Sequence, residues 1–149
     1  MDNPAIVRLL NGLIQLDLDA IRAYRQALDA VSDADVYTHL AAFMADHDRH
    51  VRDLSRVIER HGGVPTAPRV DVTGFLLEGF TAVRSVTGTH GALAAMRANE
   101  LLTNAGYDRA LGTPDLPKDV HDLIRRHDED EKRHLSWIQL RMSEAVEPA

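Results

Sequence analysis

The sequence predicts an all-α protein, a four-helix bundle made of two antiparallel helical hairpins. Apolar residues recur at steps of three and four positions over long stretches, which is the period of one face of a helix. No stretch alternates apolar and polar residues for long enough to indicate a strand. With 149 residues, the chain has the length of one compact domain, so we expect a single domain over residues 1–149.

The first two predicted helices form a hairpin because very few residues separate them. Asn3-Pro4 is typical of a helix start, with asparagine as the cap and proline in the first turn, and the apolar pattern continues to about residue 31. The second helix begins after Ser32-Asp33 and ends at Gly62-Gly63. Such a short connection makes the two helices antiparallel neighbours.

The third and fourth predicted helices form the second hairpin. They cover about residues 89–111 and 117–143, and the helical pattern is interrupted between them by Gly112-Thr113-Pro114. The link between the hairpins is long enough to run the length of the bundle, so we expect one long crossover. Within it, residues 74–86 are predicted to form a short amphipathic helix.

Composition excludes several classes of protein. The absence of cysteine rules out disulfides, thiolate metal sites and iron–sulfur clusters. The net charge of −6 argues against a nucleic-acid-binding protein, which normally has a basic face. No apolar run is long enough to span a membrane, and no signal-peptide pattern opens the chain. We therefore expect a soluble, cytoplasmic protein.

Each long predicted helix has an ionisable residue near the middle of the face that should be buried. The residues that interrupt these apolar faces are Asp17, His47, His50, Glu100, His127, Glu131 and His134. No lysine or arginine lies on the same faces. An unpartnered buried carboxylate costs several kcal/mol, so such groups pair, shift their pKa or bind a metal. Oxygen and nitrogen ligands without sulfur suit divalent iron, manganese or zinc.

The two hairpins repeat one plan. Asp17 lies seven residues before Tyr24, and Glu100 lies seven residues before Tyr107. On the second and fourth helices, a histidine follows another candidate ligand by three positions, at His47-x-x-His50 and at Glu131-x-x-His134.

This arrangement resembles the ligand plan of the ferritin-like dinuclear carboxylate proteins. The resemblance covers nearly the whole chain, which is most similar to a bacterial family of small ferritin-like bundles without an established function. It implies metal ligands at five positions, namely Asp17, His50, Glu100, Glu131 and His134. It also implies that Tyr24 and Tyr107 donate hydrogen bonds to carboxylates across the bundle.

The chain departs from the family pattern at two positions. His47 stands where a bridging glutamate is expected, and Asp17 replaces a longer glutamate. Only three carboxylates remain to neutralise two divalent ions. We therefore expect a stronger site on the side of Glu100, Glu131 and His134, and a weaker one on the side of Asp17, His47 and His50.

Other ionisable residues near these positions are expected to play lesser roles. We interpret His127 as a buried histidine that supports the ligands, with direct metal ligation as the alternative. Asp46 and Asp48, which flank His47, and the acidic run at residues 128–130 are expected to face solvent.

Three functions fit these observations. The favoured one is a metal-binding ferritin-like bundle with a mono- or dinuclear site, holding iron or alternatively manganese or zinc, that acts in metal handling or oxidative-stress defence. The second is a di-iron oxidase or peroxidase related to rubrerythrin, acting on ferrous iron, oxygen or peroxide. The third is a structural or stress-associated bundle whose polar layer only fixes the helix register.

The predicted short helix at 74–86 also suggests self-association. It offers more apolar surface than a connector needs, carried by Phe75, Leu76, Leu77, Phe80 and Val83. We therefore expect a homodimer or a higher homo-oligomer with this segment at the contact. The alternative is that the segment caps one end of a monomeric bundle.

Overall fold

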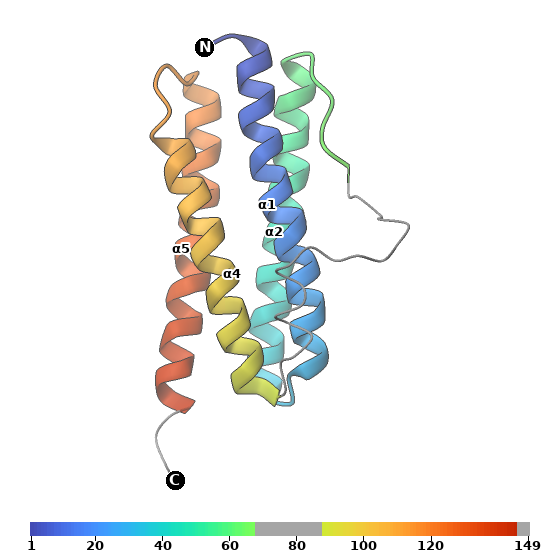
Figure 1. The fold of residues 1–149 in the computed structure, drawn as a ribbon, viewed down its shortest axis with the longest axis vertical. Helices are drawn as coiled ribbons and strands as arrows, with labels where there is room; N and C mark the ends of the chain where they lie inside the picture. Colours follow the sequence, from blue (N-terminus) through green and yellow to red (C-terminus); the bar gives the residue numbers. More distant parts are fainter. Residues whose placement is uncertain (68–87, 146–149) are drawn as a thin grey trace.

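The computed structural model describes residues 1–67 and 88–145, and Figure 1 shows their four long helices side by side. They are α1 (Asn3–Ala30), α2 (Ala34–Arg60), α4 (Gly88–Leu111) and α5 (Lys118–Ala145). No strand occurs in these two ranges. The predicted all-α bundle of two hairpins is thereby confirmed. The short helix expected at 74–86, with its intersubunit contact, lies outside the described residues.

Side-chain caps set the starts of α1 and α2. Asp2 Oδ1 accepts a hydrogen bond from Ala5 N at 2.8 Å, and Asp33 Oδ1 accepts one from Val36 N at 3.0 Å. The expected cap at Asn3 was wrong by one residue, because Asp2 takes that role and Asn3 is already helical. At the other end of α2, Gly62 has a φ of 76°, a left-handed conformation that favours glycine and ends the helix.

The four helices are not packed equally. α1 lies against both α2 and α4, and α4 also lies against α5, whereas α2 and α5 approach each other at few positions. The two helices with histidine motifs therefore line the less tightly packed side of the bundle. None of the helices in the described part is both long and apolar enough to cross a membrane.

The core is apolar towards both ends of the bundle and polar in the middle. One apolar cluster surrounds Leu10, Leu54 and Ile124, and the other surrounds Leu40 and Met96, all fully buried. The six predicted metal ligands occupy the layer between these clusters. Such a layer lies beyond the reach of solvent, so its charges must be balanced by neighbouring groups.

Candidate metal centre

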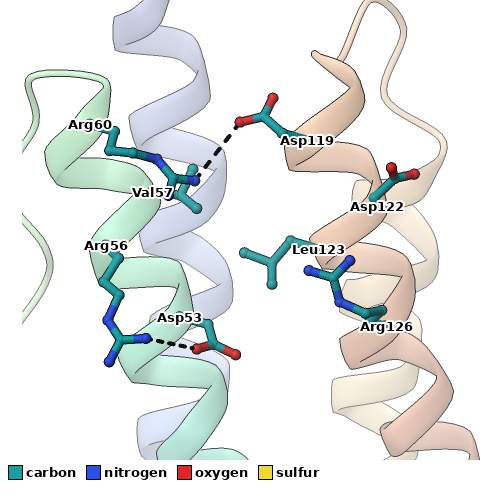
Figure 2. Close-up of a pocket in the computed structure, with 8 residues that line it drawn as sticks. All are labelled: Asp53, Arg56, Val57, Arg60, Asp119, Asp122, Leu123 and Arg126. Atoms are coloured by element: carbon teal, nitrogen blue, oxygen red, sulfur yellow. Dashed lines mark ion pairs between the residues drawn. The ribbon is translucent and has the colours of Figure 1, made fainter.

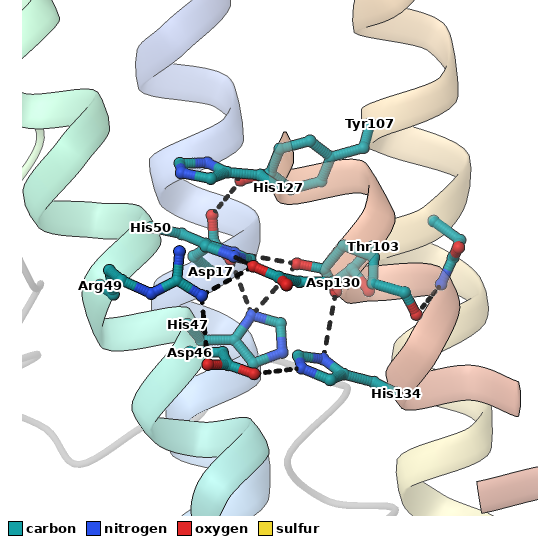
Figure 3. Close-up of polar contacts among 12 residues, drawn as sticks. Asp17, Asp46, His47, Arg49, His50, Thr103, Tyr107, His127, Asp130 and His134 are labelled. Atoms are coloured by element: carbon teal, nitrogen blue, oxygen red, sulfur yellow. Dashed lines mark hydrogen bonds and ion pairs between the residues drawn. The ribbon is translucent and has the colours of Figure 1, made fainter. Parts of the chain in front are cut away.

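Six ionisable side chains from all four long helices meet in the middle of the bundle. Four of them, Asp17, His47, His50 and His134, are labelled in Figure 3. None of the six has any solvent exposure. They are Asp17 on α1, His47 and His50 on α2, Glu100 on α4, and Glu131 and His134 on α5.

The six residues form two overlapping groups, either of which could hold a metal ion. Within each group, one ligand atom per residue lies within 4.8 Å of every other. The first group is Asp17, His47, His50 and Glu131, and the second is His47, Glu100, Glu131 and His134. The sequence-based division gave His47 to one site and Glu131 to the other. The structure differs because these two residues meet where α2 faces α5, so both groups contain them.

His47 lies between the carboxylates of the two hairpins. Its Nδ1 is 2.7 Å from Asp17 Oδ1, and its Nε2 is 3.2 Å from Glu100 Oε1. Burial disfavours the charged ring, but attraction to Glu131 and hydrogen bonds to the other two carboxylates outweigh it, so the pKa of His47 is raised well above its usual value. Without metal, His47 is therefore a buried imidazolium that balances part of the negative charge.

Glu131 is the least satisfied group of the layer. Its Oε1 lies 3.2 Å from His50 Nδ1 and its Oε2 lies 3.8 Å from His134 Nδ1. Neither oxygen, nor His134 Nδ1, has a hydrogen-bond partner in the described part of the chain. Burial raises the pKa of Glu131 to about 7, against the attraction of His47. These orphaned atoms are a donor set that a cation would complete.

Two tyrosines bind the carboxylates from the opposite hairpin. Tyr24 on α1 donates to Glu100 Oε1, and Tyr107 on α4 donates to Asp17 Oδ2 at 2.6 Å. Burial and the neighbouring carboxylates raise both tyrosine pKa values well above the usual range, so the hydroxyls remain protonated donors. Thr103 Oγ1 adds a hydrogen bond to Glu100 Oε2 at 3.1 Å. The orientations of both carboxylates are therefore fixed.

Asp46 and Asp130 were expected to face solvent, and that expectation was wrong. Asp46 Oδ2 accepts a hydrogen bond from His134 Nε2 at 2.8 Å, and Asp130 Oδ2 accepts one from His50 Nε2 at 2.9 Å. Their side chains are 22% and 20% exposed. By holding the Nε2 protons, the two aspartates leave the Nδ1 atoms facing the centre, as metal-binding histidines require.

The other acidic residues divide between surface and interior. Asp48 and Glu129 are exposed, as expected. Asp128 was also expected to face solvent, but it is 6% exposed and pairs with Lys132 Nζ at 2.6 Å.

Arg49 and Arg133 join Asp46 and Asp130 into a four-residue cover over the centre. Arg49 Nη2 lies 3.1 Å from Asp46 Oδ1 and 2.7 Å from Asp130 Oδ2. Arg133 Nη2 lies 2.9 Å from Asp46 Oδ2 and 3.1 Å from Asp130 Oδ1. Partial burial opposes ionisation of the aspartates, but hydrogen bonds from the histidines and arginines lower the pKa of both. This cover ties α2 to α5, where the helices themselves have few contacts.

The sequence does contain a signal for this cover. Residues 46–50 read Asp-His-Asp-Arg-His and residues 130–134 read Asp-Glu-Lys-Arg-His, so both follow the pattern Asp-x-x-Arg-His. The buried faces of the two helices do not reveal this repeat, because the aspartate and the arginine of each segment lie beside the apolar face and not on it.

His127 lies behind His50 and belongs to neither group of ligands. Its ring stacks on that of His50, with centroids 4.0 Å apart and planes 18° apart. Its Nδ1 lies 3.5 Å from Tyr107 Oη and its Nε2 lies 3.3 Å from Asp53 Oδ2. Burial, together with repulsion from His50, lowers the pKa of His127 to about 4. His127 therefore contacts His50 and Tyr107 without belonging to either group of candidate ligands.

Protons balance the carboxylates in the metal-free protein. Burial disfavours ionisation of Asp17, but hydrogen bonds to His47 and His50 lower its pKa to about 2. Burial likewise opposes the charge of His50, but hydrogen bonds to Asp130 and Asp17, together with the nearby carboxylate of Glu131, raise its pKa to about 10. A divalent cation can replace these protons, because it neutralises the carboxylates and binds the free imidazole nitrogens.

The fold and this centre define a four-helix bundle with a buried polar layer able to hold a metal. The chain belongs to the family described as Domain of unknown function (DUF2383), which matches residues 5–113. The matched residues cover α1 from residue 5 onward, together with α2 and α4, and end before α5, so Glu131 and His134 lie outside them. No curated protein matches the chain.

Proposed function

We propose that this protein is a ferritin-like metal-binding bundle that holds one or two divalent ions in the buried centre and acts in metal handling or oxidative-stress defence. One observation carries the proposal. Both carboxylate oxygens of Glu131 and Nδ1 of His134 are buried without hydrogen-bond partners among the described residues, where the two four-residue groups meet. A polar layer that only fixed helix register would be expected to satisfy its own members.

The proposed ligands divide around Glu131. Asp17 and His50 would hold one ion, while Glu100 and His134 would hold the other, with Glu131 and His47 available to both. These oxygen and nitrogen donors favour iron, with manganese or zinc as alternatives. Three carboxylates neutralise three of the four charges of two dications, so the second ion should bind more weakly.

A second candidate is an oxidase or peroxidase related to rubrerythrin. The observation that favours it is the overlap of the two groups at Glu131, since two metal ions that share a carboxylate are typical of di-iron bundles. Iron bound there would supply redox chemistry towards oxygen or peroxide. The residues of the chain would hold the ions, exclude bulk water and keep the tyrosine hydroxyls protonated.

Metal analysis of protein purified without chelator tests the proposal. We expect about one or two ions per chain in the wild type, and loss of most of that metal in a Glu131→Ala, His134→Ala double variant. Glu129→Gln, at an exposed position beside the centre, is the matched control and should retain the metal. If the double variant binds metal at the wild-type ratio, the ligands are wrongly assigned. Turnover with ferrous iron and peroxide separates the oxidase or peroxidase from a binding protein.

A further inference from the structure

The candidate centre is nearly symmetric, but its surroundings are not. When the two Asp-x-x-Arg-His segments are aligned, Asp46 is equivalent to Asp130 and His50 to His134. The same alignment can be extended to other positions of α2 and α5. In this correspondence, Phe43 is equivalent to His127, and Asp53 is equivalent to Trp137. One side of the centre is therefore apolar where the other is polar.

The side next to His134 is closed by aromatic rings. Phe43 stacks on His134 with ring centroids 4.3 Å apart, and Trp137 packs edge-on against Phe43 at 5.7 Å. His39 stacks on the ring of Trp137, and its side chain is partly exposed to solvent. A hydrated cation moving inward past Phe43 and Trp137 would lose its water without gaining a ligand from either ring, which is very costly in an apolar environment.

The side next to His50 contains a continuous polar route. His127 stacks on His50, and Asp53 Oδ2 lies 3.3 Å from His127 Nε2. Asp53 in turn lines a pocket of about 430 Å³ between α2 and α5 (Figure 2). Its charged lining consists of three aspartates and three arginines, namely Asp53, Asp119, Asp122, Arg56, Arg60 and Arg126. The pocket therefore connects to the candidate ligands through one carboxylate and one imidazole.

The four-residue cover leaves little acceptor capacity for an incoming ion. Asp46 and Asp130 each accept from two arginines and one histidine. Asp53, by contrast, is 27% exposed and has longer contacts, 3.3 Å to His127 and 3.6 Å to Arg56. The exposed ion pair between Arg56 and Asp53 contributes little stability and can open readily.

His127 is oriented to share a cation with Asp53. Tyr107 donates a hydrogen bond to Asp17, so its oxygen can accept one from His127 Nδ1. His127 Nε2 and Asp53 Oδ2 are joined by a hydrogen bond of 3.3 Å. A divalent cation bound between them would displace the proton of that hydrogen bond and take one nitrogen and one oxygen as ligands.

We propose that divalent metal ions reach the centre through this pocket, and that Asp53 and His127 form a transfer site that binds the ion before Asp17 and His50 do. This inference rests on the proposed metal-binding function. The two residues replace part of the hydration shell, so that the ion is never without ligands on its way inward.

Loading of the metal-free protein with Co²⁺ tests the transfer site, because cobalt absorbance in a stopped-flow instrument follows binding directly. Asp53→Asn and His127→Phe should each slow loading by about tenfold or more, with the final Co²⁺ content unchanged. His127→Phe introduces the side chain found at the equivalent position 43. Asp108→Asn removes one exposed carboxylate on α4 and should load at the wild-type rate.

The outcomes separate the two proposals. Wild-type loading rates in both variants would overturn the transfer site while leaving the metal centre intact. Reduced Co²⁺ content at an unchanged rate would also overturn it, because the residues would then be ligands of the final site. A wild type that binds no Co²⁺ would overturn both proposals. If His127→Phe fails to fold, Asp53→Asn decides alone, with Asp53→Glu expected to restore the rate.

Discussion

Asp46 on α2 accepts a hydrogen bond from His134 on α5, and Asp130 on α5 accepts one from His50 on α2. Each helix therefore orients the histidine of the other. The same contacts join α2 to α5 across the least tightly packed side of the bundle. Orientation of the proposed ligands and closure of the bundle depend on the same four residues.

Replacing Asp46 by asparagine should weaken metal binding. The amide is a neutral acceptor and cannot hold His134 and the two arginines as the carboxylate does, so we expect affinity to fall by about 10- to 100-fold. Competition with a chromogenic chelator measures this change. Asp48→Asn removes the same charge two positions away at an exposed site and should leave affinity unchanged. Equal affinities in the two variants would contradict the role of Asp46.

Replacing Glu131 by glutamine should have opposite effects with and without metal. Its pKa is raised to about 7 by burial, so at pH 8 the folded metal-free protein contains a buried carboxylate without a hydrogen-bond partner in the described part of the chain. Removing that charge should raise the free energy of unfolding by up to about 3 kcal/mol. The same variant should lose the increase in Tm, of several degrees, that metal gives the wild type. Calorimetry with and without chelator measures both effects, and a metal-free variant less stable than the wild type at pH 8 would count against this assignment.

Most of the fold could be predicted because helix periodicity is local. The faces containing Leu10, Leu40 and Ile138 are visible in the sequence, and the predicted helices agree closely with the observed ones. The polar interruptions of those faces are also visible, which is why the sequence already indicates the six residues that meet in the buried layer. Each of these observations requires only the spacing within one helix.

The contacts between helices could not be predicted in the same way. Asp46 lies beside the apolar face, and its burial depends on how closely α5 approaches α2. The sharing of His47 and Glu131 between both groups has the same origin. Periodicity gives the direction of a side chain from its own helix axis, but not the distance to the next helix.

The stability of the metal-free protein should fall as pH rises from about 5 to 9. The pKa of His50 is raised to about 10, so the stability from its charge is complete below 6.5 and is lost as pH rises through 10. The pKa of Glu131 is raised to about 7, so its burial becomes unfavourable between about 4.5 and 7. Asp17, with a pKa lowered to about 2, contributes stability above about 4 that is lost as pH falls through 2.

Metal should reverse this trend, since protons compete with the ion for the same nitrogen and oxygen atoms. The gain in Tm on adding metal should therefore increase from pH 6 to pH 8. Thermal melts at several pH values, with metal and with chelator, give both curves. In His50→Gln without metal, the loss of stability at high pH should be smaller. Parallel curves with and without metal would contradict competition between the ion and these protons.

Titration of the metal-free protein with a divalent ion should show two unequal steps, or a single filled site. Three carboxylates in the layer cannot neutralise two dications, so the second ion retains an unbalanced charge in a buried environment. His47→Glu introduces a fourth carboxylate at a position common to both groups and removes an imidazolium, so it should tighten the second step. Asp48→Glu, an exposed substitution beside it, is the control and should leave both steps unchanged. Calorimetric titration measures the two affinities, and two equal, tight steps in the wild type would refute this charge argument.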